Sequence, residues 1–196
     1  MGSELFFLAH ALHNAVIVAL TIQGVWSTLL SPIDSMNGSS SSVPAYVQIA
    51  FHVLHCVVAH RTLSKGDWAH HVLSSVAVGG LTIYYRSGPL LHYGLFFVTG
   101  LPGGINYVAL VLVKRGRMAR LAQKRLNHVL NMWLRMPGLV TWLAFAWTCR
   151  RDGAFDEMPL LPMLVQFVLI GGNGIYYAEM VALDLGKHMH RHSELQ

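Results

Sequence analysis

The sequence predicts an all-α polytopic membrane protein, a bundle of about six transmembrane helices. Hydrophobic residues make up 54% of the 196 residues, charged residues make up only 12%, and the mean hydropathy is +0.45. Soluble domains carry about 25% charged residues, so this composition indicates that lipid surrounds most of the chain. A helix needs roughly 20 apolar residues to cross a bilayer. Six stretches suit that role: Leu5–Leu30, Pro44–Leu63, Trp68–Tyr85, Pro89–Val113, Leu126–Cys149 and Pro159–Leu185.

The six stretches leave only short connections between them. Residues 1–196 are therefore predicted to form a single membrane domain. The first stretch is expected to be a true span, because it lacks the basic start of a signal peptide and exceeds the apolar length of one. No nucleic acid partner is expected, since no soluble module remains to present a groove-reading element.

Basic residues are distributed unevenly among the connections. Ten Lys and Arg residues fall in 61–67, 114–125 and the C-terminal segment, and three fall in the connections on the other side. Because basic loops stay on the cytoplasmic side, this asymmetry predicts that both termini face the cytoplasm or its topological equivalent. The loop 31–44 carries no basic residue and is predicted to be a flexible Gly/Ser linker on the opposite side.

Histidines gather where the second and third stretches meet. His52, Cys56 and His60 follow one another at four-residue spacing, which places them on roughly one helical face, with His55 beside it. The sequence "DWAHHVL" then brings an acid and two histidines, Asp67, His70 and His71, to the head of the third stretch. Polar groups in a membrane are costly and need a partner or a cavity.

Three kinds of chemistry use clustered histidines, and a purely structural role competes with all of them. A metal site is not predicted, because the HxxxH and HxxHH patterns of membrane di-iron enzymes are incomplete, and nothing specific supports a haem held by two histidines. Acid–base or acyl-transfer chemistry on a lipid suits His70 and His71, with Asp67 fixing the tautomer of one ring. In the structural alternative, the histidines hydrogen-bond one another and backbone carbonyls inside the bundle.

The fifth stretch carries a second set of polar residues. Asn127, Asn131 and Arg135 recur at four-residue spacing and so share one face. An arginine within a span is usually paired, and Glu179 of the last stretch is the available acid. We therefore expect Arg135 to contact either Glu179 or a lipid phosphate.

The run "HRTLSKGDWAHHVLSSVAVGG" resembles the central signature of the TLC-domain family, which includes ceramide synthases and the translocation-associated membrane protein. Members place an aspartate just before a histidine pair at the start of a span, as Asp67, His70 and His71 do here. Segments 97–114, 127–140 and 169–187 resemble the later family spans in the same order. The resemblance covers roughly residues 45–187.

This resemblance implies a protein of the endoplasmic reticulum membrane, with a mitochondrial or plastid membrane as the alternative, and a role connected with sphingolipid metabolism. Ceramide synthases carry a further acidic pair, whereas this chain has no carboxylate between Asp67 and Asp152. We therefore expect a divergent member that binds or organises membrane lipid through His52, His55, Asn131 and Arg135. The alternatives are a structural subunit beside other membrane proteins, or an acyltransferase with Asp67, His70 and His71 as catalytic residues. No cofactor is expected, apart from acyl-CoA as the co-substrate of such an enzyme.

Glycines mark two of the stretches. Because glycine and proline lower helix propensity, the sequence Gly100-Leu101-Pro102-Gly103-Gly104 predicts a break or kink in the fourth stretch. Small residues also let membrane helices pack closely, which is the other interpretation of these glycines and of Gly171, Gly172 and Gly174.

Overall fold

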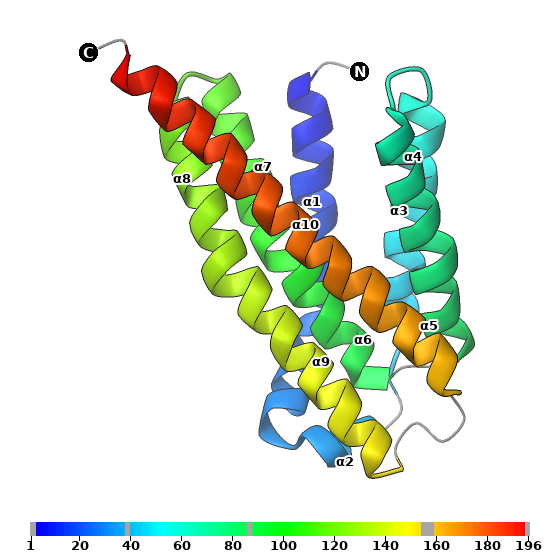
Figure 1. Ribbon diagram of the computed structural model, residues 1–196. Coiled ribbons are helices and arrows are strands. Elements are labelled where there is room, and N and C mark those ends of the chain that lie inside the picture. Colours follow the sequence, from blue (N-terminus) through cyan, green and yellow to red (C-terminus); the bar gives the residue numbers. More distant parts are fainter. Residues whose placement is uncertain (1–2, 38–39, 86–87, 154–158, 195–196) are drawn as a thin grey trace.

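The computed structural model describes residues 3–37, 40–85, 88–153 and 159–194, and these residues form helices and no strand (Figure 1). The all-α prediction is therefore confirmed. The α-helices are α1 Ser3–Leu30, α2 Pro32–Asn37, α3 Val43–Ala59, α4 Lys65–Val72, α5 Gly80–Tyr84, α6 Gly88–Leu95, α7 Leu101–Lys114, α8 Arg120–Leu130, α9 Met136–Arg151 and α10 Leu160–Ser193. Three π-helical segments connect some of them: Leu73–Gly79, Phe96–Gly100 and Asn131–Arg135.

Segments that follow one another without interruption form six helical rods in the described part of the chain. Their residues are 3–30, 43–59, 65–84, 88–114, 120–151 and 160–193, so each rod corresponds to one predicted apolar stretch. Three of the rods are long and apolar enough to cross a membrane: Glu4–Leu30, Gly88–Lys114 and Leu160–Arg191. The rods 120–151 and 160–193 exceed the predicted stretches, because their helices continue into basic sequence that hydropathy does not detect.

The loop 31–44 differs from the flexible linker that its composition predicted. Residues Pro32–Asn37 form the short helix α2. Proline suits the first position of a helix because its missing N–H would have no partner there, and Asp34 lies in the first turn, where the helix dipole favours a negative charge.

The expected irregularity in the fourth stretch takes the form of a π-helical segment, Phe96–Gly100, that ends two residues before Pro102. The segment Asn131–Arg135 ends at the same distance before Pro137. Proline offers no N–H to the preceding turn and its ring crowds the carbonyl four residues earlier, so a widened turn relieves both problems. The last rod has no such interruption: α10 is a continuous α-helix that includes Gly171, Gly172 and Gly174.

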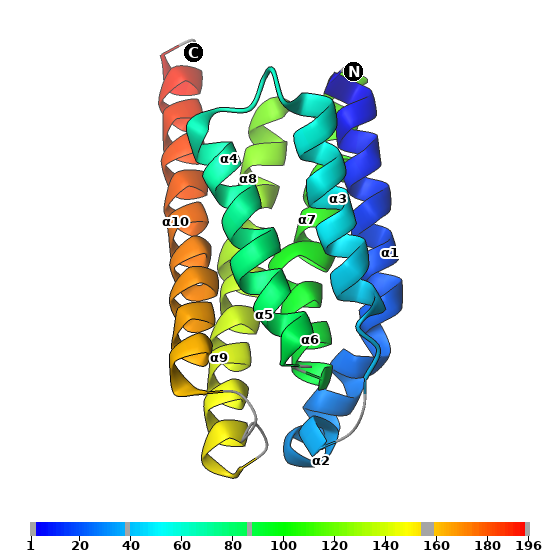
Figure 2. The ribbon, with the colours of Figure 1, turned by 90° about the vertical axis from the view of Figure 1, so that its right-hand side faces the viewer.

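Both described chain ends lie at one end of the bundle, together with the turns at 60–64 and 115–119 (Figure 1). We call this the terminal end, and α2 lies at the opposite, α2 end. Figure 2 shows the rods side by side, with α3 and α4 on the near face. This arrangement brings the basic segments 61–65 and 114–125 to the same end as both termini.

The bundle has an apolar half and a polar half. The hydrophobic core lies toward the α2 end and includes Leu90, Tyr93, Leu139, Trp142 and Met163, and the Trp142 indole donates to the Leu90 carbonyl at 3.0 Å. Toward the terminal end the interior is instead lined by histidine, glutamine and tyrosine side chains. Large apolar side chains cover the outside of all six rods. This inverted pattern is what a bundle surrounded by lipid requires.

Candidate functional site

The histidine cluster begins at the start of α4, where Ser64 caps the helix. The Ser64 hydroxyl accepts a hydrogen bond from the Asp67 N–H at 3.2 Å, while one Asp67 oxygen accepts from the Ser64 N–H at 2.9 Å and from the Ser64 hydroxyl at 2.8 Å. This reciprocal capping box fixes where α4 starts. The hydrogen bonds to the carboxylate also hold the pKa of Asp67 below its usual value.

The expectation that Asp67 fixes the tautomer of a catalytic histidine stays a prediction and gains no support from the hydrogen bonds of Asp67. Within the described residues its carboxylate bonds to Ser64 and makes no hydrogen bond to His70 or His71. A charge three residues before the histidine pair suits helix capping, because the third helical position faces back over the first turn. Asp67 therefore positions the helix that carries His70 and His71 rather than either imidazole.

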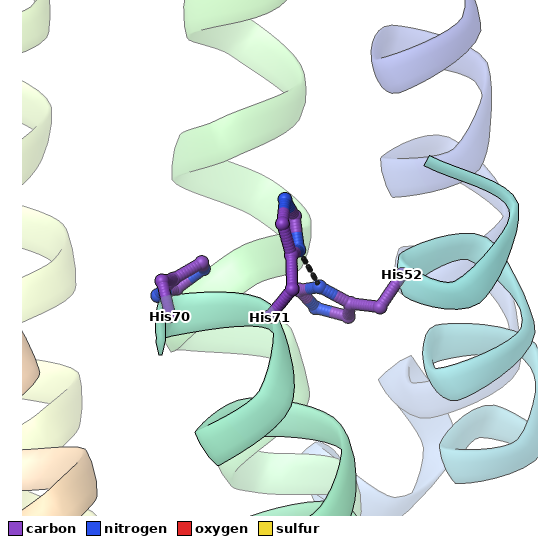
Figure 3. A group of neighbouring side chains, drawn as sticks. All are labelled: His52, His70 and His71. Carbon is purple, nitrogen blue, oxygen red and sulfur yellow. Dashed lines mark hydrogen bonds between the residues drawn. The ribbon is translucent and has the colours of Figure 1, made fainter. Parts of the chain in front are cut away.

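His52 of α3 and the pair His70 and His71 of α4 come together between the two rods (Figure 3). The Nδ1 atoms of His52 and His71 lie 2.6 Å apart and form a hydrogen bond. One nitrogen from each of the three rings lies within 4.8 Å of the others. The sequence predicted the individual residues, and the packing of α3 against α4 makes them one cluster.

A chain of hydrogen bonds continues from this cluster into the bundle interior. The Nε2 atom of His13, in α1, contacts Gln48 Oε1 at 2.9 Å, and Gln48 Nε2 contacts His52 Nε2 at 2.7 Å. Because the Gln48 amide nitrogen is a donor, His52 accepts at Nε2, and its Nδ1–H donates to Nδ1 of His71. The chain thus has a defined direction from His13 to His71.

His13 and Gln48 were missed by the sequence analysis, as was His10. All three lie within predicted spans, and the four-residue spacing of Gln48 and His52 was a usable signal for their contact. His10 joins through ring contacts, with its centroid 5.2 Å from that of His55 and 4.6 Å from that of Tyr107.

His55 and His70 complete the cluster on two sides. The His55 ring packs edge-on against His71 with centroids 4.6 Å apart. The His70 ring lies 5.7 Å from that of Tyr177, and the Asn173 side chain of α10 also interacts with it. The cluster therefore spans three rods besides α1.

A groove between α3 and the rod 65–84 exposes this cluster to the outside of the bundle. Its volume is about 380 Å³, and the surface that lines it is almost entirely apolar, because the histidine and serine residues border it mainly through carbon atoms. The lining residues are His52, Val53, Cys56, Val57, His60, Trp68, His71, Val72, Ser75 and Val76. The predicted shared face of His52, Cys56 and His60 is confirmed, since all three border this groove.

Arg135 forms the second polar group of the interior. Its Nη1 donates to Asn131 Oδ1 at 2.6 Å, and the Asn131 amide donates to the Asn127 carbonyl at 2.8 Å. The Arg135 Nε atom is buried and has no hydrogen-bond partner among the described residues. Tyr107 and Tyr177 lie close enough to interact electrostatically with the guanidinium.

The expected ion pair between Arg135 and Glu179 is wrong. Glu179 is exposed, and among the described residues no carboxylate pairs with Arg135. The two residues lie on different rods, and the rotation of α10 about its axis directs position 179 outward. Of the four residues expected to bind lipid, His52 and His55 lie in the histidine cluster and Asn131 and Arg135 form the second group.

The chain matches no family model, no curated protein and no solved structure. The chemistry of the site therefore rests on its own residues. A neutral imidazole donates through one nitrogen and accepts through the other, so it can bind either a hydrogen-bond acceptor or a hydrogen-bond donor. Its unprotonated nitrogen can also offer a lone pair to a cation. An arginine without an acidic partner favours an anion.

Proposed function

We propose that this chain is an integral membrane protein that crosses the bilayer six times and holds a membrane lipid in the groove between α3 and the rod 65–84. The acyl chain lies along the apolar lining, and the polar part of the lipid reaches the His52–His71 pair. The observation that carries this proposal is the presence of two hydrogen-bonded histidines in an otherwise apolar groove on the outside of the bundle.

Six spans are supported by the dimensions and surfaces of the rods. At about 1.5 Å per residue, the shortest rod, 43–59, is about 25 Å long, and helices of about 17 residues are the lower limit for a span. All six rods expose large apolar side chains. Three rods are not among the helices long and apolar enough to be candidate spans, and these rods expose Val57, Val76 and Trp133. A rod that remained in water would be expected to carry a polar outer face.

The geometry of the groove supports a lipid rather than a water-soluble ligand. Hydrophobic walls offer nothing to a strongly solvated molecule, whereas an acyl chain can pack against them by van der Waals contact without losing hydration. The histidines add selectivity, because a polar group in lipid loses its hydration and needs a hydrogen-bond partner. Arg135 lies outside the groove lining, and among the described residues no carboxylate pairs with it, so it offers a second, interior position that favours an anionic or phosphate group.

Membership of the TLC-domain family and residence in the endoplasmic reticulum are part of the proposal and rest on the sequence resemblance. The two alternative functions have less support. An acyltransferase loses its expected acidic residue, because the Asp67 carboxylate bonds to Ser64. The outer surface of the bundle is apolar, as contact with other membrane subunits would require. Contact with lipid requires the same kind of surface, so this feature does not favour the subunit role.

The lipid proposal is tested with the full chain in nanodiscs that contain a phospholipid with a photoreactive acyl chain. After illumination, peptide mass spectrometry should locate the crosslinks on groove residues such as Val53, Val57 and Val76. The variant Val76→Trp should fill the groove and reduce this labelling severalfold, since position 76 is 69% exposed and tolerates a larger side chain without repacking.

The matched control is Val168→Trp on α10, at a position that is 71% exposed and lies outside the groove. Labelling of the groove should be unchanged in this variant. Crosslinks spread evenly over all rods, or labelling that persists in Val76→Trp, would show that lipid contacts the protein only as solvent does.

A further inference from the structure

His52, His70 and His71 share a property that lipid binding does not use. Each ring directs one nitrogen to within 4.8 Å of a nitrogen from both other rings (Figure 3). Neutral imidazole is a good ligand for Zn²⁺, Cu²⁺, Ni²⁺ and Fe²⁺, and three nitrogen ligands with a fourth open position are typical of catalytic Zn²⁺ sites. We propose that these three histidines bind a divalent transition-metal ion, with Zn²⁺ as the ion that the ligand set favours.

Side-chain rotations must bring the three nitrogens, which now lie within 4.8 Å of one another, to the spacing of a metal site. Zn–N bonds of about 2.0–2.1 Å in a tetrahedral arrangement place two ligand nitrogens about 3.3 Å apart. The Nδ1 atoms of His52 and His71 are 2.6 Å apart because they share a hydrogen bond. A side-chain rotation that separates them by about 0.7 Å therefore replaces one N–H···N bond with two Zn–N bonds.

The proton that His52 holds at Nδ1 must move for the metal to bind there. It leaves Nδ1, and Nε2 gains a proton, so the ring stays neutral and changes tautomer. His71 already accepts at Nδ1 in the hydrogen-bonded chain, so its Nδ1 lone pair faces the metal position without a proton transfer. No net proton is released by this exchange at the imidazoles.

Gln48 is the residue placed to support the new tautomer. Its amide now donates to His52 Nε2 and accepts from His13 Nε2. When the Gln48 amide rotates by 180° about its last bond, Oε1 accepts from His52 Nε2–H, and the amide nitrogen donates to His13 Nε2, whose own proton moves to Nδ1 so that the His13 ring stays neutral. Metal-binding histidines commonly donate their second N–H to an oxygen in this way, and loss of that partner costs about 10–100-fold in metal affinity. Gln48 is thus a positioning residue.

His52 and His71 both border the groove, so a fourth ligand could approach the ion from that side. Three neutral ligands leave the ion with its full charge, and Asp67 does not neutralise it while bonded to Ser64. The open position therefore favours hydroxide, a carboxylate or a phosphate oxygen. The metal site does not require a lipid, so it stands apart from the proposed lipid binding.

The test uses the full chain, purified in nanodiscs with an affinity tag free of histidine and stripped of metal by a chelator. Dialysis against Zn²⁺ followed by elemental analysis should give one Zn²⁺ per chain, and Co²⁺ should produce the visible absorption of a tetrahedral site. His71→Ala should lower the Zn²⁺ affinity at least tenfold and remove that absorption. His60→Ala is the control, because His60 borders the same groove but its Nδ1 bonds to the Val57 carbonyl.

Two further variants leave all three ligands in place and do not depend on the folding of His71→Ala. Gln48→Ala should weaken Zn²⁺ binding about 10–100-fold. Gln48→Glu should retain or raise the affinity, because a carboxylate accepts from His52 Nε2–H without any rotation. Equal Zn²⁺ binding by the unmodified chain and His71→Ala, or equally weak binding by Gln48→Ala and Gln48→Glu, would overturn the proposal. Val76→Trp tests the lipid groove separately.

Discussion

Ser64 determines the role of Asp67, because its hydroxyl and its backbone amide both donate to the same carboxylate oxygen. These bonds lower the pKa of Asp67 below the ordinary value of about 3.9. A carboxylate with a lowered folded-state pKa contributes stability that is fully present above the unfolded pKa. That contribution is lost as the pH falls through the folded pKa, so the cap on α4 weakens only in acid.

Replacement of the capping hydroxyl should therefore be visible at Asp67. In Ser64→Ala we expect the Asp67 pKa to rise toward its ordinary value and the start of α4 to lose about 1 kcal/mol of stability. Carbon-13 NMR of the Asp67 carboxyl during a pH titration measures the shift, and Ser64→Thr, which keeps the hydroxyl, is the control. An Asp67 pKa that stays low in Ser64→Ala would contradict the role given to Ser64.

The tautomers of the histidines follow from neighbours on other rods. The amide orientation of Gln48 makes His52 an acceptor at Nε2 and a donor at Nδ1. In the hydrogen-bonded series from His13 to His71, each imidazole therefore has a defined donor or acceptor nitrogen. This order distinguishes the cluster from histidines that bond only to separate backbone carbonyls, as the exposed His60 does with Val57.

At the level of elements, prolines and glycines shape the rods in different ways. Pro102 and Pro137 each follow a π-helical segment by two residues, so the rods 88–114 and 120–151 stay continuous while their turns widen. Several glycines instead allow close approach between rods. A methyl group at Gly138 would overlap the Phe97 side chain, whereas one at Gly172 would meet no atom within 4 Å.

This contrast predicts opposite effects for two similar substitutions. Gly138→Ala should lower stability by about 1–3 kcal/mol, because the added methyl forces the packed rods apart. Gly172→Ala should be neutral or raise stability by up to about 1 kcal/mol through helix propensity. Thermal unfolding of the two variants in the same detergent measures the difference, and a shift of the same sign in both would contradict the packing described here.

At the level of the whole molecule, polarity is divided along the bundle axis. The hydrophobic core lies toward α2, and the chain of hydrogen bonds from His13 to His71 lies toward the termini, although the buried His92 bonds to the Ser41 carbonyl near α2. The basic segment 114–125 lies at the terminal end as well (Figure 1). If the bundle crosses the bilayer as proposed, a lipid or metal reaches the histidines from the half of the bilayer beside these basic segments.

Cysteine labelling of sealed vesicles tests this orientation. In a chain with Cys56→Ser and Cys149→Ala, single cysteines at Arg117→Cys and Ser193→Cys should react with an impermeant maleimide from the same side. Asp152→Cys, which follows α9 at the α2 end, should react only from the other side. Reaction of positions 117 and 193 from opposite sides would contradict six spans.

The sequence by itself determined the helical class and the approximate place of each rod, because hydropathy and helix periodicity are local properties of the chain. It also singled out His52, His70, His71, Asn131 and Arg135, since polar residues within apolar stretches are conspicuous. The four-residue spacing of Asn131 and Arg135 predicted that they share one helical face, and within that rod the two side chains form a hydrogen bond.

Only the tertiary structure decided which side chains meet across rods. The contact of His52 with His71, the link from His13 through Gln48, and the outward direction of Glu179 all depend on how far each rod is rotated about its axis. That rotation is set by packing among several rods together, and a turn of one residue, about 100°, would direct each of these groups elsewhere. The histidine cluster is therefore a property of the assembled bundle, although each of its residues is visible in the sequence.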